Sequence, residues 1–160
     1  MGVKYLILEN IRSAYNVGAI FRTADGAGVS KIFLVGYTPA PIDRFGRPQS
    51  EIHKTSLGAS AVIEWEKSDD ITEVITALQA DDVQVVAVEQ KADAVQLQNF
   101  TVPETVAYIL GNEIDGVSVE ACQLSDVVLE IPMLGSKESL NVSVAAGVVM
   151  YHDCKTVTNS

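Results

Sequence analysis

Short apolar runs, separated by segments of helical periodicity, constrain the fold of this chain more than any other feature. The runs occupy residues 3–9, 31–36, 83–88, 105–110 and 127–131, and a weaker one lies at 62–66. Runs of this length with few polar side chains are typical of strands that are buried on both faces. Because such runs alternate with helical patterns, the sequence predicts an α/β fold, a mostly parallel sheet flanked by helices.

The segments between the runs predict the helices and one loop. Apolar residues recur at helical spacing after Asn16, which we expect to cap a helix that ends at Gly28. Further helices are predicted over residues 69–80, at a short turn that begins at 118, and over 141–151. Residues 37–56 contain three prolines and predict a long loop. A loop of this length inside a compact domain is more often functional than idle.

The length and the cysteines bound the class of protein. A chain of 160 residues without a linker predicts one domain over residues 1–160. No apolar run reaches the ~18 residues of a membrane span, and the N-terminus lacks the layout of a cleavable signal. Cys122 and Cys154 form no CxxC pair and have no histidine at metal-ligand spacing. We therefore expect a cytoplasmic protein with two free thiols and no bound metal.

The charge is divided unevenly along the chain. The net charge is −10, but residues 1–60 carry seven Lys and Arg against four acidic side chains, and residues 61–160 carry four against seventeen. We interpret the acidic part as a solubilising surface and the basic part as a patch that contacts phosphates. The candidate phosphate contacts are Arg12, Arg22, Arg44, Arg47 and Lys54.

Three segments carry motifs: NVGAIFRTADGAGV (16–29), ILGNEIDGVS (109–118) and IPMLGSKESLNVSVAAGVVMYH (131–152). Each has a plain structural interpretation when taken alone. Asn16 and Asn141 would be helix caps, Arg22 a solvated side chain, and GNEIDG a turn. Together, in this order and over almost the whole chain, the segments resemble the SpoU (TrmH-like) branch of the SPOUT RNA methyltransferases.

The resemblance implies a fold and an activity. It implies a C-terminal trefoil knot, which composition does not predict. It also implies transfer of a methyl group from S-adenosylmethionine to a ribose 2′-hydroxyl of RNA, by a homodimer and without a metal. The Ala-, Val- and Gly-rich helix after Asn141 would supply part of the dimer contact.

The same resemblance assigns roles to individual residues. The catalytic group would be Arg22, Asn16, Glu113, Ser139 and Asn141. The cofactor would contact Leu110, Gly111, Ile131, Met133, Gly135 and Leu140, and Glu89, at the end of the run 83–88, is a lesser candidate for the rim of its site. Since an arginine keeps its proton above pH ~12, we favour a role for Arg22 in orienting the substrate and stabilising the developing alkoxide over a role as general base. The sequence does not decide between these roles.

The sequence bears on the choice of RNA substrate and on two other classes of protein. The matching segments fill the chain, without the additional N-terminal domain or basic C-terminal extension of many relatives, and this slightly favours tRNA over rRNA. Because the composition is acidic, an accessory RNA-binding protein could supply part of the affinity for RNA.

One alternative is a catalytically silent SPOUT module that binds RNA or cofactor. Another, a nicotinamide-dependent oxidoreductase, requires a GxGxxG motif that residues 8–22 lack.

Overall fold

One parallel seven-stranded sheet organises the protein, in a computed structural model that describes residues 2–152. The strand order is β3-β2-β1-β6-β4-β7-β5. The strands are β1 (Val3–Glu9), β2 (Lys31–Val35), β3 (Glu64–Ser68), β4 (Gln84–Val88), β5 (Val95–Gln96), β6 (Thr105–Leu110) and β7 (Val127–Glu130). The α-helices are α1 (Ala14–Gly26), α2 (Ser50–Ser56), α3 (Ile71–Ala80), α4 (Val119–Leu124) and α5 (Val142–Tyr151). The predicted α/β class with a parallel sheet is confirmed.

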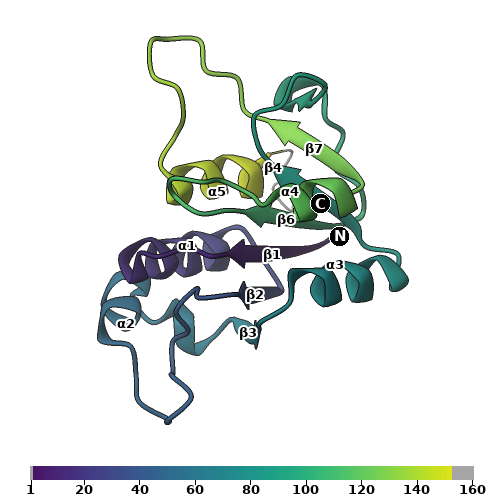
Figure 1. The fold of residues 1–160 in the computed structure, drawn as a ribbon. Helices are drawn as coiled ribbons and strands as arrows, with labels where there is room; N and C mark the ends of the chain where they lie inside the picture. Colours follow the sequence, from purple (N-terminus) through teal and green to yellow (C-terminus); the bar gives the residue numbers. More distant parts are fainter. Residues whose placement is uncertain (1, 153–160) are drawn as a thin grey trace, which may run out of the picture.

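Helices cover both faces of this sheet (Figure 1). Along β1, Leu6 and Leu8 belong to the core shared with α1 and α5, whereas Ile7 belongs to the core shared with α3 and α4. This alternation follows from the pleat, which points successive side chains to opposite faces. Both cores are apolar, so the central strands are hydrophobic throughout. Among the helices of residues 2–152, none has the length and apolar character of a membrane span.

Two sequence predictions about local structure were wrong. The cap of α1 is Ser13, whose Oγ accepts a hydrogen bond from the Asn16 backbone N–H at 3.1 Å, so Asn16 lies inside the first turn. The predicted loop over 37–56 contains α2, which Gln49 caps. The prolines of that segment precede the helix, and a helix of only seven residues gives little periodicity to detect.

The contact between α1 and α2 depends on a glycine. A Cβ atom at Gly18 would lie 1.7 Å from Thr55 Oγ1 and 2.9 Å from the Ile52 carbonyl oxygen. Only a residue without a side chain permits this approach. Gly18 therefore fixes α2 and the segment before it against the helix that carries Asn16 and Arg22.

The strand order brings two of the motif segments and Glu89 to one end of the sheet. Strands β6, β4 and β7 are neighbours and parallel, so their carboxyl ends lie side by side. The segment 109–118 follows β6, Glu89 follows β4, and the segment 131–141 follows β7. In open α/β sheets, ligands bind at this edge, near the point where the strand order reverses.

Candidate functional site

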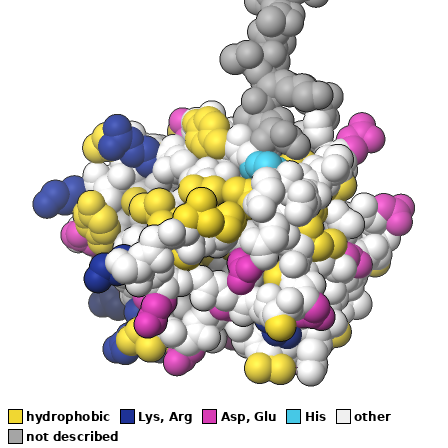
Figure 2. All heavy atoms as spheres, turned by 90° about the horizontal axis from the view of Figure 1, so that it is seen from above, with side chains coloured by type: hydrophobic (Ala, Val, Ile, Leu, Met, Phe, Trp, Pro, Cys, Tyr) yellow, Lys and Arg dark blue, Asp and Glu magenta, His cyan; other side chains and the backbone are white. Residues whose placement is uncertain are grey.

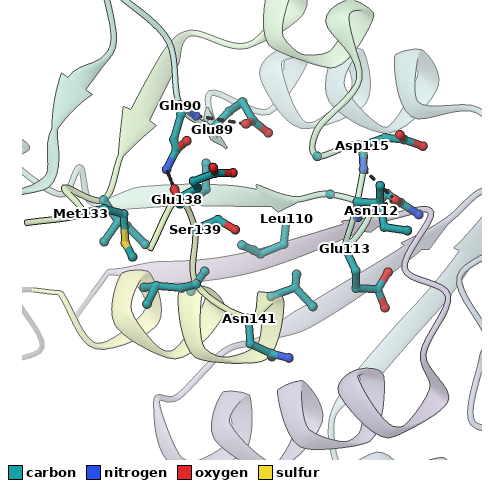
Figure 3. A pocket seen from close by; sticks show the side chains of 18 residues that line it. Glu89, Gln90, Leu110, Asn112, Glu113, Asp115, Met133, Glu138, Ser139 and Asn141 are labelled. Carbon is teal, nitrogen blue, oxygen red and sulfur yellow. Dashed lines mark hydrogen bonds between the residues drawn. The ribbon is translucent and has the colours of Figure 1, made fainter. Parts of the chain in front are cut away.

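A cavity of about 470 Å³ lies at the carboxyl ends of β4, β6 and β7. Most of the predicted cofactor and catalytic residues line it: Glu89, Leu110, Gly111, Glu113, Ile131, Met133, Ser139, Leu140 and Asn141. Figure 3 shows them around the hollow, with Met133 on one side, Glu113 and Asn112 on the other, and Leu110 and Ser139 between. Three segments far apart in the sequence therefore form one site.

The turn after β6 forms one wall of this cavity. Asn112 and Gly116 exchange two backbone hydrogen bonds, of 3.1 and 2.9 Å, and the Asn112 Oδ1 accepts from the N–H groups of Ile114 and Asp115. A Cβ atom at Gly111 would lie 2.3 Å from the Gly116 backbone, so this position excludes every side chain. The turn is rigid, and Gly111 permits it.

Glu113 joins this wall to the start of α1. Its carboxylate accepts from the backbone N–H groups of Arg12 and Ser13, both at 2.9 Å, and from the Asn16 Nδ2 at 3.3 Å. Burial alone would raise the pKa of Glu113, but these donors outweigh it and hold the pKa below the ordinary value. The carboxylate is thus a fixed anion that positions the buried side chain of Asn16, which does not itself line the cavity.

The opposite wall comes from the segment that leads into α5. Asn141 is the N-cap of α5, as predicted, and its Oδ1 accepts from the Ser143 N–H at 2.9 Å and the Ser143 hydroxyl at 2.7 Å. The Asn141 amide group is thereby held with its NH₂ available as a donor. Leu140 and Ser139 precede it on the cavity side. Gly135 lies outside the lining, with no heavy atom within 4 Å of its Cβ position.

The end of β4 connects the two walls. Glu89 accepts from the Val117 N–H at 2.9 Å, which ties it to the turn after β6. Gln90 donates from Nε2 to the Glu138 carbonyl oxygen at 2.5 Å, which ties β4 to the opposite wall. Gln90, Asp115 and Glu138 also line the cavity and were missed in the sequence, where only their positions beside Glu89, Gly116 and Ser139 could have indicated them.

The composition of the lining fits S-adenosylmethionine. Apolar side chains, including Leu110, Met133 and Leu140, offer surfaces for an adenine ring, and the volume is within the range of small-molecule sites. Four carboxylates (Glu89, Glu113, Asp115 and Glu138) surround the hollow, and the described lining contains no Lys, Arg or His. Such a site favours a ligand with net positive charge, which the sulfonium and ammonium groups of this cofactor provide.

Arg22 lines a different cavity, of about 520 Å³, and shares it with Lys54. Its other lining residues come from α1, α2, the residue after α2 and the end of α5: Tyr15, Ala19, Thr23, Gly26, Thr55, Leu57 and Tyr151. No acidic side chain is among them. The two cavities have no lining residue in common, so the structure separates Arg22 from Ser139 and Asn141.

The other predicted phosphate contacts are exposed on the same half of the chain. Arg12 is exposed to solvent. It lies beside the first cavity because its backbone N–H donates to Glu113, which lines that cavity. Arg44 and Arg47 lie in an exposed turn ahead of α2. Viewed from above, most of the Lys and Arg side chains visible on this face lie along one edge of the molecule, next to hydrophobic side chains in the middle of the face (Figure 2).

The structure describes one of the two cysteines and the surroundings of most candidate metal ligands. Cys122 is free and buried, and burial raises the pKa of its thiol, so it is a poor nucleophile. Cys154 lies outside the described residues. Within residues 2–152, no three His, Cys, Asp or Glu side chains are grouped as metal ligands would be.

Comparison with known proteins gives a consistent set of relatives. The 23S rRNA (guanosine-2′-O-)-methyltransferase RlmB of Neisseria meningitidis serogroup B is 29% identical over 145 residues, which are 91% of this chain and 55% of that protein. The tRNA (guanosine(18)-2′-O)-methyltransferase of Thermus thermophilus is 34% identical over 146 residues, covering 91% and 71%. This chain thus spans little more than half the length of RlmB.

A solved structure and a family model agree with these relatives. The AdoMet-bound rRNA methyltransferase from Sinorhizobium meliloti superposes with a TM-score of 0.83 at 31% identity, over 94% of this chain and 55% of that one. The model of the SpoU rRNA Methylase family matches residues 4–151. The match includes both cavities, the first two motif segments and all but the last residue of the third, and the chain belongs to the SpoU rRNA Methylase family.

Proposed function

We propose that this protein transfers a methyl group from S-adenosylmethionine to a ribose 2′-hydroxyl of RNA. One observation carries the proposal: the second and third motif segments meet with Glu89 in a single cavity, apolar over part of its lining and acidic over the rest, and Glu113 in that lining accepts a hydrogen bond from Asn16 of the first segment. Relatives with 2′-O-methyltransferase names support it, as does the structure of an AdoMet-bound rRNA methyltransferase.

Little covalent chemistry is required of the side chains. The bound cofactor supplies an activated methyl group, and the protein has to align the acceptor oxygen and exclude water. Leu140, Ile131 and Met133 would contact the adenine, and the carboxylates of Asp115 and Glu138 would favour the cationic form of the ligand. Ser139 and the Asn141 amide would hold the acceptor ribose beside the methyl group.

Arg22 would reach this acceptor from a second copy of the chain. It lies six residues beyond Asn16, or about 9 Å along the helix axis, and lines the second cavity. The first turn of α5 lines the first cavity and its last residue, Tyr151, lines the second. One apolar side chain near each end of α5 is exposed to solvent: Val144 at 51% and Tyr151 at 50%. Two copies packed through antiparallel α5 helices would place each Arg22 opposite the partner's first cavity, as a two-fold interface requires.

The remaining assignments extend the proposal. One of these relatives is named as an rRNA enzyme and the other as a tRNA enzyme, so both RNA classes are candidate substrates. Guanosine is the nucleoside in both relatives' names, which makes it the first base to test. The trefoil knot, the single domain, the cytoplasmic location and an accessory RNA-binding protein stay predictions.

The direct test incubates purified protein with labelled S-adenosylmethionine and either undermodified tRNA or rRNA, and identifies labelled nucleosides after digestion. We expect a 2′-O-methylated nucleoside from one pool. Cofactor binding without transfer to either pool would contradict the proposal and favour the silent module.

The second copy can be tested by mixing variants. Arg22→Ala removes the guanidinium, and Leu140→Arg blocks the first cavity with a cation. Each alone should be inactive, but co-expression should restore about a quarter of wild-type activity, because half of the random dimers then contain one intact composite site. No restoration would show that Arg22 acts within its own chain.

A further inference from the structure

The exposed turn between β2 and α2 is organised around an aromatic ring. We call Asp43–Arg47 the Arg-Phe-Arg turn. The ring of Phe45 is 66% exposed, and the guanidinium carbons of Arg44 and Arg47 lie 4.8 and 5.0 Å from its centroid. Burial does not explain this phenylalanine, because its side chain contributes to neither core.

Hydrogen bonds fix the shape of the turn. The Asp43 carboxylate accepts from the N–H groups of Phe45 and Arg47 and from the Arg47 Nε, all at 2.9 Å. Backbone bonds between Asp43 and Arg47 and between Gly46 and Asp43 close it. Below, Ile42 and Pro48 pair as an antiparallel bridge. The ring is thus presented on a preorganised support, which lowers the entropic cost of binding.

The two arginines are held differently. Arg47 is tied to Asp43 and cannot move away from the turn without breaking an ion pair. For Arg44, the contacts in the described part of the chain include no hydrogen bond or ion pair, only the ring of Phe45. Arg44 can therefore leave the ring face at little cost, exposing a π-surface while its charge stays close by.

The base of the turn is anchored beside the Arg22 cavity. The His53 Nε2 lies 3.1 Å from the Pro41 carbonyl oxygen, and the Gln49 N–H donates to the same oxygen at 2.8 Å. Lys54, one residue beyond His53, lines the cavity that contains Arg22. The ring, Arg44, Arg47 and Lys54 therefore belong to one basic side of the molecule, consistent with the edge of Lys and Arg in Figure 2.

We propose that the Arg-Phe-Arg turn binds an unpaired RNA base, which stacks on Phe45 in place of Arg44, while Arg44 and Arg47 contact the flanking phosphates. This inference rests on the proposed function and deepens it: the substrate is an RNA with an unpaired segment near the modified ribose. Bases stack on exposed aromatic rings without regard to sequence. In a duplex the bases stack on one another and cannot reach the ring.

The test compares one RNA in two forms. A stem-loop with 2-aminopurine in its loop, and the same strand annealed to its complement, are titrated with the full chain while anisotropy and 2-aminopurine fluorescence are recorded. Phe45→Ala should weaken stem-loop binding about tenfold and abolish the fluorescence change, with duplex binding unaltered. Phe45→Trp should restore both, and Val119→Ala, an exposed apolar residue on α4, should change neither.

Two outcomes would overturn the inference. Wild-type affinity of Phe45→Ala for the stem-loop, in a protein that transfers methyl groups to RNA, would overturn the stacking role alone. Failure of the wild-type chain to bind either RNA form or to methylate either RNA pool would overturn the stacking role and the proposed function together.

Discussion

The two cavities of this protein have similar sizes and opposite chemistry. The first, of about 470 Å³, contains four carboxylates in its lining and no basic side chain; the second, of about 520 Å³, contains Arg22 and Lys54 and no acidic one. The first is built on rigid turns at strand ends, and the second on the contact of three helices. The difference suggests a division of labour, in which the first cavity takes the cationic methyl donor and the acceptor ribose, and the second takes the phosphates of the RNA.

This division also accounts for the acidic composition of a protein that we propose to bind RNA. The net charge of −10 reflects the part of the chain that builds the first cavity, whereas the basic residues concentrate in residues 1–60. Affinity for phosphate depends on the local patch rather than on the total charge.

The largest expected effect comes from removing the guanidinium of the second cavity. Arg22→Ala should lower methyl transfer about a hundredfold or more, because a donor aimed at developing negative charge is lost. Cofactor affinity, measured by calorimetry, should stay at the wild-type value. Lys91→Ala serves as the control for loss of one exposed charge, and should retain activity.

The next effect concerns the rigid turn of the first cavity. Gly111→Ala should destabilise the protein by about 3 kcal/mol, because its methyl group would lie 2.3 Å from the Gly116 backbone. Thermal unfolding measures the loss. Gly135→Ala is the matched control, since its Cβ position is open, and an equal loss there would contradict the packing argument.

A smaller effect should follow from neutralising the first cavity. The double variant Asp115→Asn, Glu138→Gln should weaken S-adenosylmethionine about fivefold, since both carboxylates are exposed and partly screened. S-adenosylhomocysteine, which lacks the sulfonium charge, should be weakened less. Calorimetry at low and high salt checks both ligands, and equal losses for the two would exclude charge selection.

The smallest effect is a pH dependence at Glu113. Since hydrogen bonds lower its pKa below the ordinary value of 4.5, the ionised carboxylate stabilises the fold above that pH, and the contribution disappears as the pH falls through the lowered pKa. The difference in unfolding free energy between wild type and Glu113→Gln should be about 1 kcal/mol at neutral pH, because the group is exposed. A difference that persists under strongly acidic conditions would contradict this origin.

Much of the fold and of the first cavity could be predicted from the sequence. Buried parallel strands are continuous apolar runs, and their boundaries differ from the predicted ones by at most two residues. Motifs that follow neighbouring parallel strands must meet at one sheet edge, so Glu89, Gly111 and Asn141 were predictable as neighbours. The family, predicted from the three motif segments, is confirmed.

Other features depend on tertiary contacts that local patterns do not encode. Helix α2 packs closely against α1 because Gly18 has no side chain, and nothing within residues 50–56 signals that contact. The sequence suggests Asn16 as the N-cap of α1, but Ser13 is the N-cap. The side-chain amide of Asn16 therefore remains free to donate to Glu113, about a hundred residues away in the sequence. The sequence likewise does not predict that Arg22 lies apart from the first cavity, because this depends on how α5 packs between the two cavities.

Paired binding measurements test most directly whether the first cavity binds the methyl donor and the second binds the RNA phosphates. S-adenosylmethionine and the RNA pool that accepts methyl groups are titrated separately into wild type, Arg22→Ala with Lys54→Ala, and Asp115→Asn with Glu138→Gln. We predict that the first pair weakens RNA binding and leaves the cofactor affinity unchanged, and that the second pair does the reverse. Loss of both ligands from either pair of substitutions would contradict the division between the cavities.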